Sequence, residues 1–280
     1  MSREEDIITI RQGNSSVSIH HHGATVTSWK CDGLEMLFVS KDAIFNNKKA
    51  IRGGIPVVFP NFGPWELGPQ HGFARITRWT LKESVSNESC GEAKAVFTLT
   101  DTEETRKIWN YNFCVTYTIL LRNKEFETRL QVENSGSDEF EFTTLLHTYF
   151  SVPDINKTTI SGLQGLQFID KVCESQKFTE DRDQVAIKEN YDRVYMSTPN
   201  MHVIKNAAGG HSVRMVKENF PDTVVWNPWI DKAKGMSDFG DEEYLNMLCV
   251  EPGHVSSPLT LTSGAVFEGK QLLSIIDSNL

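Results

Sequence analysis

The chain has 280 residues, 39% of them hydrophobic and 23% charged, which is the composition of a folded globular protein with room for a sizeable core. Its formal net charge of -9 repels nucleic-acid backbones and acidic membrane surfaces, so neither is an expected partner, and a bound anion would need a local basic cluster. Five cysteines, at positions 31, 90, 114, 173 and 249, form no C-x-x-C pair and predict reduced thiols rather than a disulfide framework.

The N-terminal segment is charged and lacks the apolar core of a signal peptide, so a cytoplasmic location is expected. Short strands are predicted next, and here His20, His21 and His22 are consecutive. In a strand His20 and His22 would share one face and could bind zinc together with a carboxylate. Because the chain has no H-E-x-x-H motif and no cysteine pair, a surface histidine run is the favoured interpretation, and no metal is expected.

Residues 51–75, IRGGIPVVFPNFGPWELGPQHGFAR, contain four of the ten prolines and five of the 19 glycines. Proline fixes φ, and glycine adopts backbone conformations that other residues avoid, so the segment predicts a shaped loop rather than a helix. The loop could hold four polar side chains in place: Arg52, Gln70, His71 and Arg75. An ordinary long connection with solvated arginines is the alternative.

Residues 113–150 show the clearest strand pattern. Apolar residues alternate from Phe113 to Leu121 and again after a short turn at 122–125, and a second turn precedes residues 140–150. An antiparallel meander of three strands is predicted. His147 would lie on the face of the sheet opposite Phe140. That face is exposed to solvent in an ordinary sandwich, but on a large concave sheet it forms the floor of a cleft.

Short strand-like runs recur along the rest of the chain, whereas helical signals are confined to residues 100–109 and 240–248. Many short strands with regularly spaced turns predict an all-β sandwich. No internal repeat and no Pro/Gly/Ser-rich linker divides the sequence, so residues 1–280 are interpreted as a single domain.

Three side chains are candidates for acid–base chemistry near neutral pH: His71 in the loop, His147 on its strand, and Glu251 in LCVEPGHV at a strand end. A solvated edge carboxylate is the alternative for Glu251. The G-x-S-x-G, G-x-x-x-x-G-K-[ST] and G-x-G-x-x-G motifs are absent, so the sequence does not support a serine nucleophile, a P-loop or a Rossmann cofactor site. Arg52 and Arg75 could still grip a phosphate through their guanidinium forks.

Three tryptophans lie among prolines and glycines: Trp65 in FGPWELG, and Trp226 and Trp229 in VVWNPW. Such tryptophans can serve as platforms for sugar faces. The favoured interpretation is that they are rigid pieces of the core.

Taken together, these segments resemble the hexose-6-phosphate mutarotases, the glucose-6-phosphate 1-epimerase branch of the aldose 1-epimerase superfamily. The resemblance rests on IRGGIPVVFPNFGPW, QHGFAR, LLHTYFSV, NYDRVY, VVWNPW and LCVEPGHV, which span nearly the full chain in the family's order. It implies a galactose mutarotase-like supersandwich of antiparallel strands, with a cleft on a concave sheet and no metal or organic cofactor. A small-molecule sugar phosphate is the implied partner, and a monomer is expected.

The resemblance also implies a role for each candidate residue. His147 would be the general acid and Glu251 the general base, while Asp192 from NYDRVY would bond the sugar hydroxyls. The loop would present Arg52, Gln70, His71 and Arg75 to one sugar phosphate. The two arginines would receive the 6-phosphate, and His71 would support the reacting ring oxygen.

The implied activity is interconversion of the α and β anomers of hexose 6-phosphates, glucose 6-phosphate above all. Glu251 would take the proton of the anomeric hydroxyl as His147 protonates the ring oxygen, so the glutamate must begin ionised and the histidine protonated near neutrality. A non-catalytic sugar-phosphate binding module on the same fold is the alternative. A carbohydrate-cleaving enzyme would need a second carboxylate partner, which is not apparent in the sequence.

Overall fold

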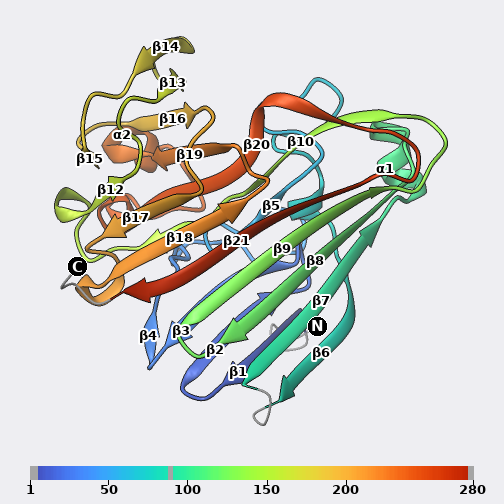
Figure 1. Ribbon diagram of the computed structural model, residues 1–280, viewed down its shortest axis with the longest axis horizontal. Helices are drawn as coiled ribbons and strands as arrows, with labels where there is room; N and C mark the ends of the chain where they lie inside the picture. Colours follow the sequence, from blue (N-terminus) through green and yellow to red (C-terminus); the bar gives the residue numbers. More distant parts are fainter. Residues whose placement is uncertain (1–5, 88–90, 277–280) are drawn as a thin grey trace.

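The computed structural model describes residues 6–87 and 91–276, which form three β-sheets with few short helices (Figure 1). All pairings between the described strands are antiparallel. The prediction of an all-β architecture is therefore confirmed.

In order across each sheet, the strands are as follows. The four-stranded sheet contains β1 (Ile7–Gln12), β2 (Ser15–His20), β3 (Thr25–Cys31) and β4 (Leu34–Glu35). The eight-stranded sheet contains β14 (Gln176–Thr179), β13 (Gln167–Asp170), β16 (Tyr191–Tyr195), β19 (Asp222–Asn227), β20 (Met247–Leu261), β10 (Phe140–Leu146) and β5 (Val57–Val58), and β11 (Tyr149–Ser151) also pairs with β20. The nine-stranded sheet contains β15 (Gln184–Ala186), β12 (Thr159–Ser161), β17 (Met201–Lys205), β18 (Ser212–Glu218), β21 (Val266–Ile276), β9 (Glu125–Asn134), β8 (Phe113–Arg122), β7 (Glu92–Thr100) and β6 (Thr80–Asn87).

The helices are short. The first predicted helical segment forms α1 (Glu103–Ile108), which Thr102 begins with a capping box. The second forms only a 3₁₀ turn, η6 (Glu243–Asn246). A second α-helix, α2 (Trp229–Lys234), was not predicted, because its sequence begins within the proline- and tryptophan-rich VVWNPW. The remaining 3₁₀ turns are η2 (Ala74–Ile76), η4 (Ile155–Lys157) and η5 (Ala208–Gly210).

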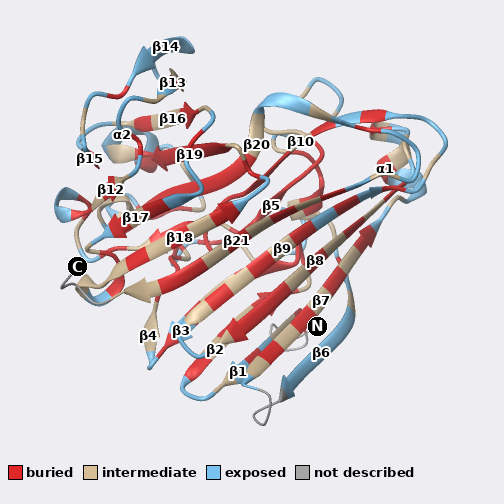
Figure 2. Cartoon of the chain, viewed as in Figure 1, coloured by how far each residue is buried: buried red, intermediate tan, exposed pale blue. Residues whose placement is uncertain are grey.

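The main core lies against one face of the nine-stranded sheet. Buried and partly exposed residues alternate along β7, β8 and β9 (Figure 2), and Phe113, Val115 and Tyr117 are each 0% exposed, as their spacing predicted. The ring of Trp29 from β3 packs 5.4 Å from that of Phe126 in β9, so the small sheet shares this core.

The predicted three-strand meander is wrong at its third strand. β8 and β9 pair as expected, but β10 pairs with β20 and β5 in the eight-stranded sheet. The physical reason lies at Asn134, a buried residue at the end of β9 whose side-chain amide donates to the carbonyl groups of Asp138 and Leu261. These bonds hold the turn that carries the chain out of the first sheet, and β21 takes the place beside β9.

Residues 51–75 form a shaped loop, as predicted, with only β5 and the start of η2 in regular structure. The loop closes on itself at Gly72, whose φ is +71° and where a Cβ would lie 2.1 Å from the carbonyl oxygen of Phe59. The amide of Phe73 donates to that same carbonyl at 3.1 Å, and the amide of His71 donates to the carbonyl of Gly63 at 2.9 Å. Glycine at 72 allows this close approach.

The prediction of a surface histidine run is wrong, because His20 and His22 are each only 2% exposed. His22 Nε2 lies 2.8 Å from the carbonyl oxygen of Lys49, and burial lowers the pKa of both rings. They are packing residues that tie β2 to the segment around Lys49.

The cysteine prediction is confirmed for the four described cysteines, which are free thiols: Cys31 and Cys249 are buried, Cys114 is half-buried and Cys173 is exposed. Cys90 lies outside the described residues. No helix within residues 6–87 and 91–276 is long and apolar enough to cross a membrane.

Candidate active site

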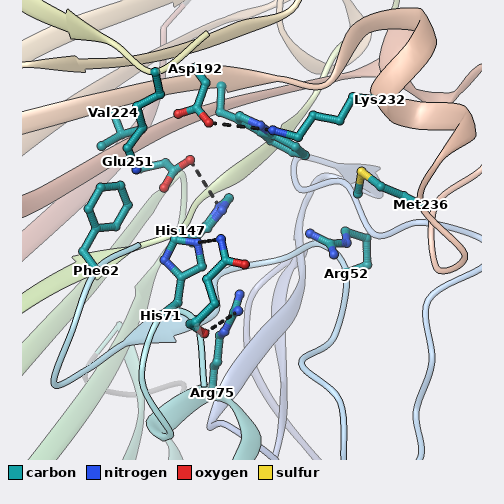
Figure 3. A pocket seen from close by; sticks show the side chains of 13 residues that line it. Arg52, Phe62, His71, Arg75, His147, Asp192, Val224, Lys232, Met236 and Glu251 are labelled. Atoms are coloured by element: carbon teal, nitrogen blue, oxygen red, sulfur yellow. Dashed lines mark hydrogen bonds and ion pairs between the residues drawn. The ribbon is translucent and has the colours of Figure 1, made fainter. Parts of the chain in front are cut away.

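A pocket of about 220 Å³ opens on the eight-stranded sheet where it meets residues 51–75 (Figure 3). The structure places all seven predicted site residues in its lining: Arg52, Gln70, His71, Arg75, His147, Asp192 and Glu251. The loop contributes the first four, and the sheet contributes or flanks the other three.

Strand register puts the sheet residues on one face. Asp192 in β16 pairs with Trp226 in β19, and Glu251 in β20 pairs with Val224 in β19. Directly paired residues share a face, as do residues two apart on one strand, so all four side chains point into the pocket.

Register also explains why His147 meets Glu251. Leu145 pairs with Gly253, and Tyr149 pairs with Cys249, so His147 lies opposite Glu251 between these two pairs. The Nδ1 of His147 is 3.3 Å from the Oε1 of Glu251, and both side chains are buried. Neither Nδ1 of His147 nor Oε2 of Glu251 has a hydrogen-bond partner among the described residues. His147 therefore faces the pocket rather than solvent.

Burial acts on this pair in opposite directions. It raises the pKa of Glu251, and the nearby charge of Asp192 raises it further. It lowers the pKa of His147, and the positive charges of His71 when protonated, of Arg75 and of Arg52 lower it further. Burial therefore disfavours the charged form of both groups, whereas their 3.3 Å contact favours the ion pair that the proposed chemistry needs.

His71 is placed as a hydrogen-bond donor to the pocket. The amide of Gly63 donates to its Nδ1 at 3.1 Å, so the neutral ring carries its proton on Nε2. Burial, aided by the charge of Arg75, lowers the pKa of His71 to about 3. The Gln70 amide group lies 3.3 Å from Nε2, and with this tautomer it accepts through its oxygen. The His71 and His147 ring centroids are 6.0 Å apart.

The two arginines have different surroundings. Arg52 donates to both carboxylate oxygens of Asp238, at 3.2 and 3.3 Å, and to the Tyr149 hydroxyl at 3.3 Å. Arg75 donates to the carbonyl of Gln70 at 2.9 Å and forms no ion pair with a described carboxylate. The buried Nε of Arg75 has no hydrogen-bond partner among the described residues. Burial lowers the pKa of Arg75 to about 10. Arg75 is therefore the less compensated cation.

Two lysines in the lining were missed by the sequence analysis. Lys171 follows β13 and holds its ammonium 4.2 Å from the centroid of the Phe62 ring. Lys232 in α2 holds its ammonium 3.8 Å from Oδ2 of Asp192. Nothing in the sequence around either lysine distinguishes it from a surface lysine, because only strand pairing and the turn into α2 bring them to the pocket.

The tryptophans divide between the two interpretations. Trp226 lines the pocket and also packs against Tyr149 with ring centroids 5.9 Å apart. Trp229 packs on Tyr244 at 5.2 Å, and Trp65 packs on the main core. Trp226 is thus the candidate sugar platform.

A family model for aldose 1-epimerase matches residues 6–274. A relative from Cenchrus ciliaris, named "Putative glucose-6-phosphate 1-epimerase", is 37% identical over 98% of this chain and 86% of the relative. A relative of the same name from Escherichia coli (strain K12) is 36% identical over 92% of this chain and 86% of the relative.

Solved structures agree with this placement. The crystal structure of a "putative mutarotase" from Salmonella typhimurium is 30% identical, with a TM-score of 0.89 over 98% of this chain and 92% of that chain. The structure of a galactose 1-epimerase from Lactobacillus acidophilus NCFM is 14% identical, with a TM-score of 0.73 over 97% of this chain and 94% of that chain. At this identity the likeness is one of fold alone. The predicted galactose mutarotase-like fold is confirmed, and the chain belongs to the aldose 1-epimerase family.

Proposed function

We propose that this protein interconverts the α and β anomers of hexose 6-phosphates, with glucose 6-phosphate as the substrate. The observation that carries the proposal is the opposition of His147 and Glu251 at 3.3 Å inside a pocket that also contains Arg52 and Arg75 (Figure 3). The ring oxygen and the anomeric hydroxyl of a pyranose are both bonded to C1. An acid and a base that act on them must therefore converge within a few ångström, as these two side chains do.

In the proposed reaction Glu251 removes the proton of the anomeric hydroxyl while His147 protonates the ring oxygen, and the C1–O5 bond breaks to give the open-chain aldehyde. Rotation about C1–C2 presents the other face of the carbonyl group. The O5 hydroxyl then attacks C1 as its proton returns to His147, and Glu251 returns its proton to O1. Glu251 and His147 thus return to their starting protonation states. Throughout the cycle the Nε2–H of His71 donates a hydrogen bond to O5 of the sugar.

The neutral pair favoured by burial and the ion pair needed for this reaction hold the same number of protons. One proton moved from Glu251 to His147 across 3.3 Å converts the first into the second. The charges of Arg52 and Arg75 are among the causes that lower the pKa of His147. A bound phosphate dianion offsets those charges, so substrate binding favours the protonated imidazole.

The charge of the pocket suits a phosphate ester. The overall charge is -9, yet four basic side chains line the pocket against two carboxyl groups, and one of these two, Glu251, is favoured neutral by burial. Arg75, with its unpartnered buried Nε, is the proposed main phosphate ligand, and Arg52 is the second. Asp192 lies 3.8 Å from the ammonium of Lys232 and is proposed to accept hydrogen bonds from sugar hydroxyls.

The proposal also treats residues 1–280 as one catalytic domain that acts as a monomer. The lining runs from Arg52 to Glu251, so the pocket needs both halves of the chain. Sedimentation at assay concentration tests the monomer.

The test of the reaction is magnetisation exchange between the two anomers of glucose 6-phosphate, followed by NMR at neutral pH, with glucose as the comparison substrate. Faster exchange of the phosphate ester, absent with a Glu251→Gln variant, is the expected result. Binding of glucose 6-phosphate without faster exchange would instead support the non-catalytic binding module. A change in substrate mass would support glycoside cleavage.

A further inference from the structure

Cys249 is a core residue behind the pocket lining and has no part in the proposed reaction. It lies two residues before Glu251 on β20 and therefore on the same face, and it pairs with Trp226 on one side and Tyr149 on the other. Its side chain is 0% exposed. One imidazole nitrogen of His147, the Sγ of Cys249 and a carboxylate oxygen of Glu251 all lie within 4.8 Å of one another.

The donor set fits a borderline-soft divalent cation. Imidazole nitrogen, thiolate sulfur and carboxylate oxygen are the three ligand types that Zn²⁺ uses in proteins. Two ligands each about 2.0–2.1 Å from a tetrahedral metal lie about 3.3–3.4 Å apart. The Nδ1 of His147 and the Oε1 of Glu251 are separated by 3.3 Å.

Two further observations point to a ligand at this place. Oε2 of Glu251 is a buried atom without a hydrogen-bond partner among the described residues, and Nδ1 of His147 has there only its 3.3 Å contact with Oε1 of Glu251, so a bound ion would give both atoms a partner. Binding releases the protons of the Cys249 thiol and of the Glu251 carboxyl group to solvent, and the resulting set of zinc ion, thiolate and carboxylate is electrically neutral, which suits a buried position.

We propose that Zn²⁺, or a cation of similar chemistry such as Co²⁺ or Cd²⁺, binds to His147, Cys249 and Glu251 and inhibits the enzyme. The fourth tetrahedral position faces the pocket. The ion occupies the two groups that the sugar needs for proton transfer, so metal and sugar phosphate exclude each other. Mg²⁺ and Ca²⁺ do not compete, because they prefer all-oxygen ligand sets. The metal is an inhibitor here and not a cofactor.

The direct test is titration of the metal-free protein with Co²⁺. A thiolate-to-cobalt charge-transfer band together with the intense visible bands of tetrahedral Co²⁺ is expected, and both should be lost in Cys249→Ser. Cys114→Ser, which changes a half-buried cysteine outside the pocket lining, is the matched control and should retain them. This spectrum needs no turnover, so it tests the site separately from the proposed function.

The second test is inhibition, with free Zn²⁺ fixed by a chelator buffer and each variant compared with its own metal-free rate. Loss of one ligand should raise the inhibition constant at least about tenfold in Cys249→Ser, and glucose 6-phosphate should compete with the metal. If Cys249→Ser does not fold, Glu251→Gln serves for the cobalt titration, where weaker binding is expected.

Three results would overturn the proposal. One is a cobalt spectrum without the thiolate band, and another is a spectrum that Cys249→Ser leaves unchanged. The third is loss of the bands in His22→Asn, which would place the metal in the N-terminal histidine group instead.

Discussion

His147 and Glu251 are cross-strand neighbours, held opposite each other by β20 and by the chain that passes from β10 to β11. Their reactive atoms are 3.3 Å apart, and both side chains are buried. This placement allows a proton to pass between the two groups, and the charges of Arg75 and Arg52 oppose its residence on His147.

Glu251→Gln should lower kcat for glucose 6-phosphate by about 10²–10⁴-fold, because glutamine keeps the shape of the side chain but cannot take the anomeric proton. KM should change little, since the proposed phosphate ligands remain. NMR exchange measurements give both constants. Glu141→Gln, an exposed carboxylate on β10, is the control and should behave as wild type. Full activity in Glu251→Gln would exclude this residue as the base.

The same substitution should change how stability depends on pH. Burial raises the pKa of Glu251 above its ordinary value of 4.5. Between the two values the folded protein holds a proton that the unfolded chain releases. The stabilising contribution is therefore complete below pH 4.5 and is lost as pH rises through the folded-state pKa. Urea unfolding should show wild type losing stability relative to Glu251→Gln as pH increases. Parallel pH profiles would contradict the raised pKa.

Arg75→Ala should raise KM for glucose 6-phosphate by about tenfold to a hundredfold, the usual effect of losing a charge-assisted hydrogen bond. Glucose itself should be affected far less, because it has no phosphate. Arg78→Ala is the matched control, since Arg78 is half-exposed and pairs with Asp6 outside the pocket. An equal loss for both sugars would refute the phosphate assignment.

Arg75→Ala should also move the titration of His147 to higher pH. After burial and the neighbouring His71, the charge of Arg75 is the next cause that lowers the pKa of His147. NMR of ¹⁵N-labelled imidazoles follows the ring directly, with His147→Asn to assign its signals. The same ring should titrate unchanged in Arg78→Ala. No movement in Arg75→Ala would mean that the two groups are not electrostatically coupled.

Gly72→Ala should reduce the free energy of unfolding by at least about 3 kcal/mol, because the new Cβ would collide with the backbone of Phe59 at a positive φ. Gly13→Ala has a similar φ of +54° but no atom within 4 Å, so it should cost only about 1 kcal/mol. Urea unfolding of both variants isolates the contribution of the close approach. Equal losses would show that backbone strain alone decides the outcome.

The local patterns of the sequence predicted much of this structure. Alternation identified the buried faces of β8 and β9, the capping residue Thr102 identified α1, and the proline and glycine content of residues 51–75 identified a shaped loop. Each of these rests on interactions between residues close together in the chain, whose spacing the sequence displays directly.

Predictions that needed long-range information failed or stayed open. The pattern around β10 predicts a strand correctly but does not say which sheet it joins, and the run at His20 and His22 does not reveal that it is covered by the segment around Lys49. Lys171 and Lys232 gave no signal, because their distance from the pocket is set by strand order and by α2.

Local sequence patterns sufficed to predict β8, β9, β10, the polar loop and the family, because these depend on short-range periodicity and on motifs of contiguous residues. The folded arrangement alone shows that His147 opposes Glu251, that Cys249 shares the face of Glu251, and that Asp238 pairs with Arg52 while Arg75 has no such partner among the described residues. Residues 147 and 251 are brought together by hydrogen-bond register in a sheet, and register is a property of paired backbones rather than of either segment alone.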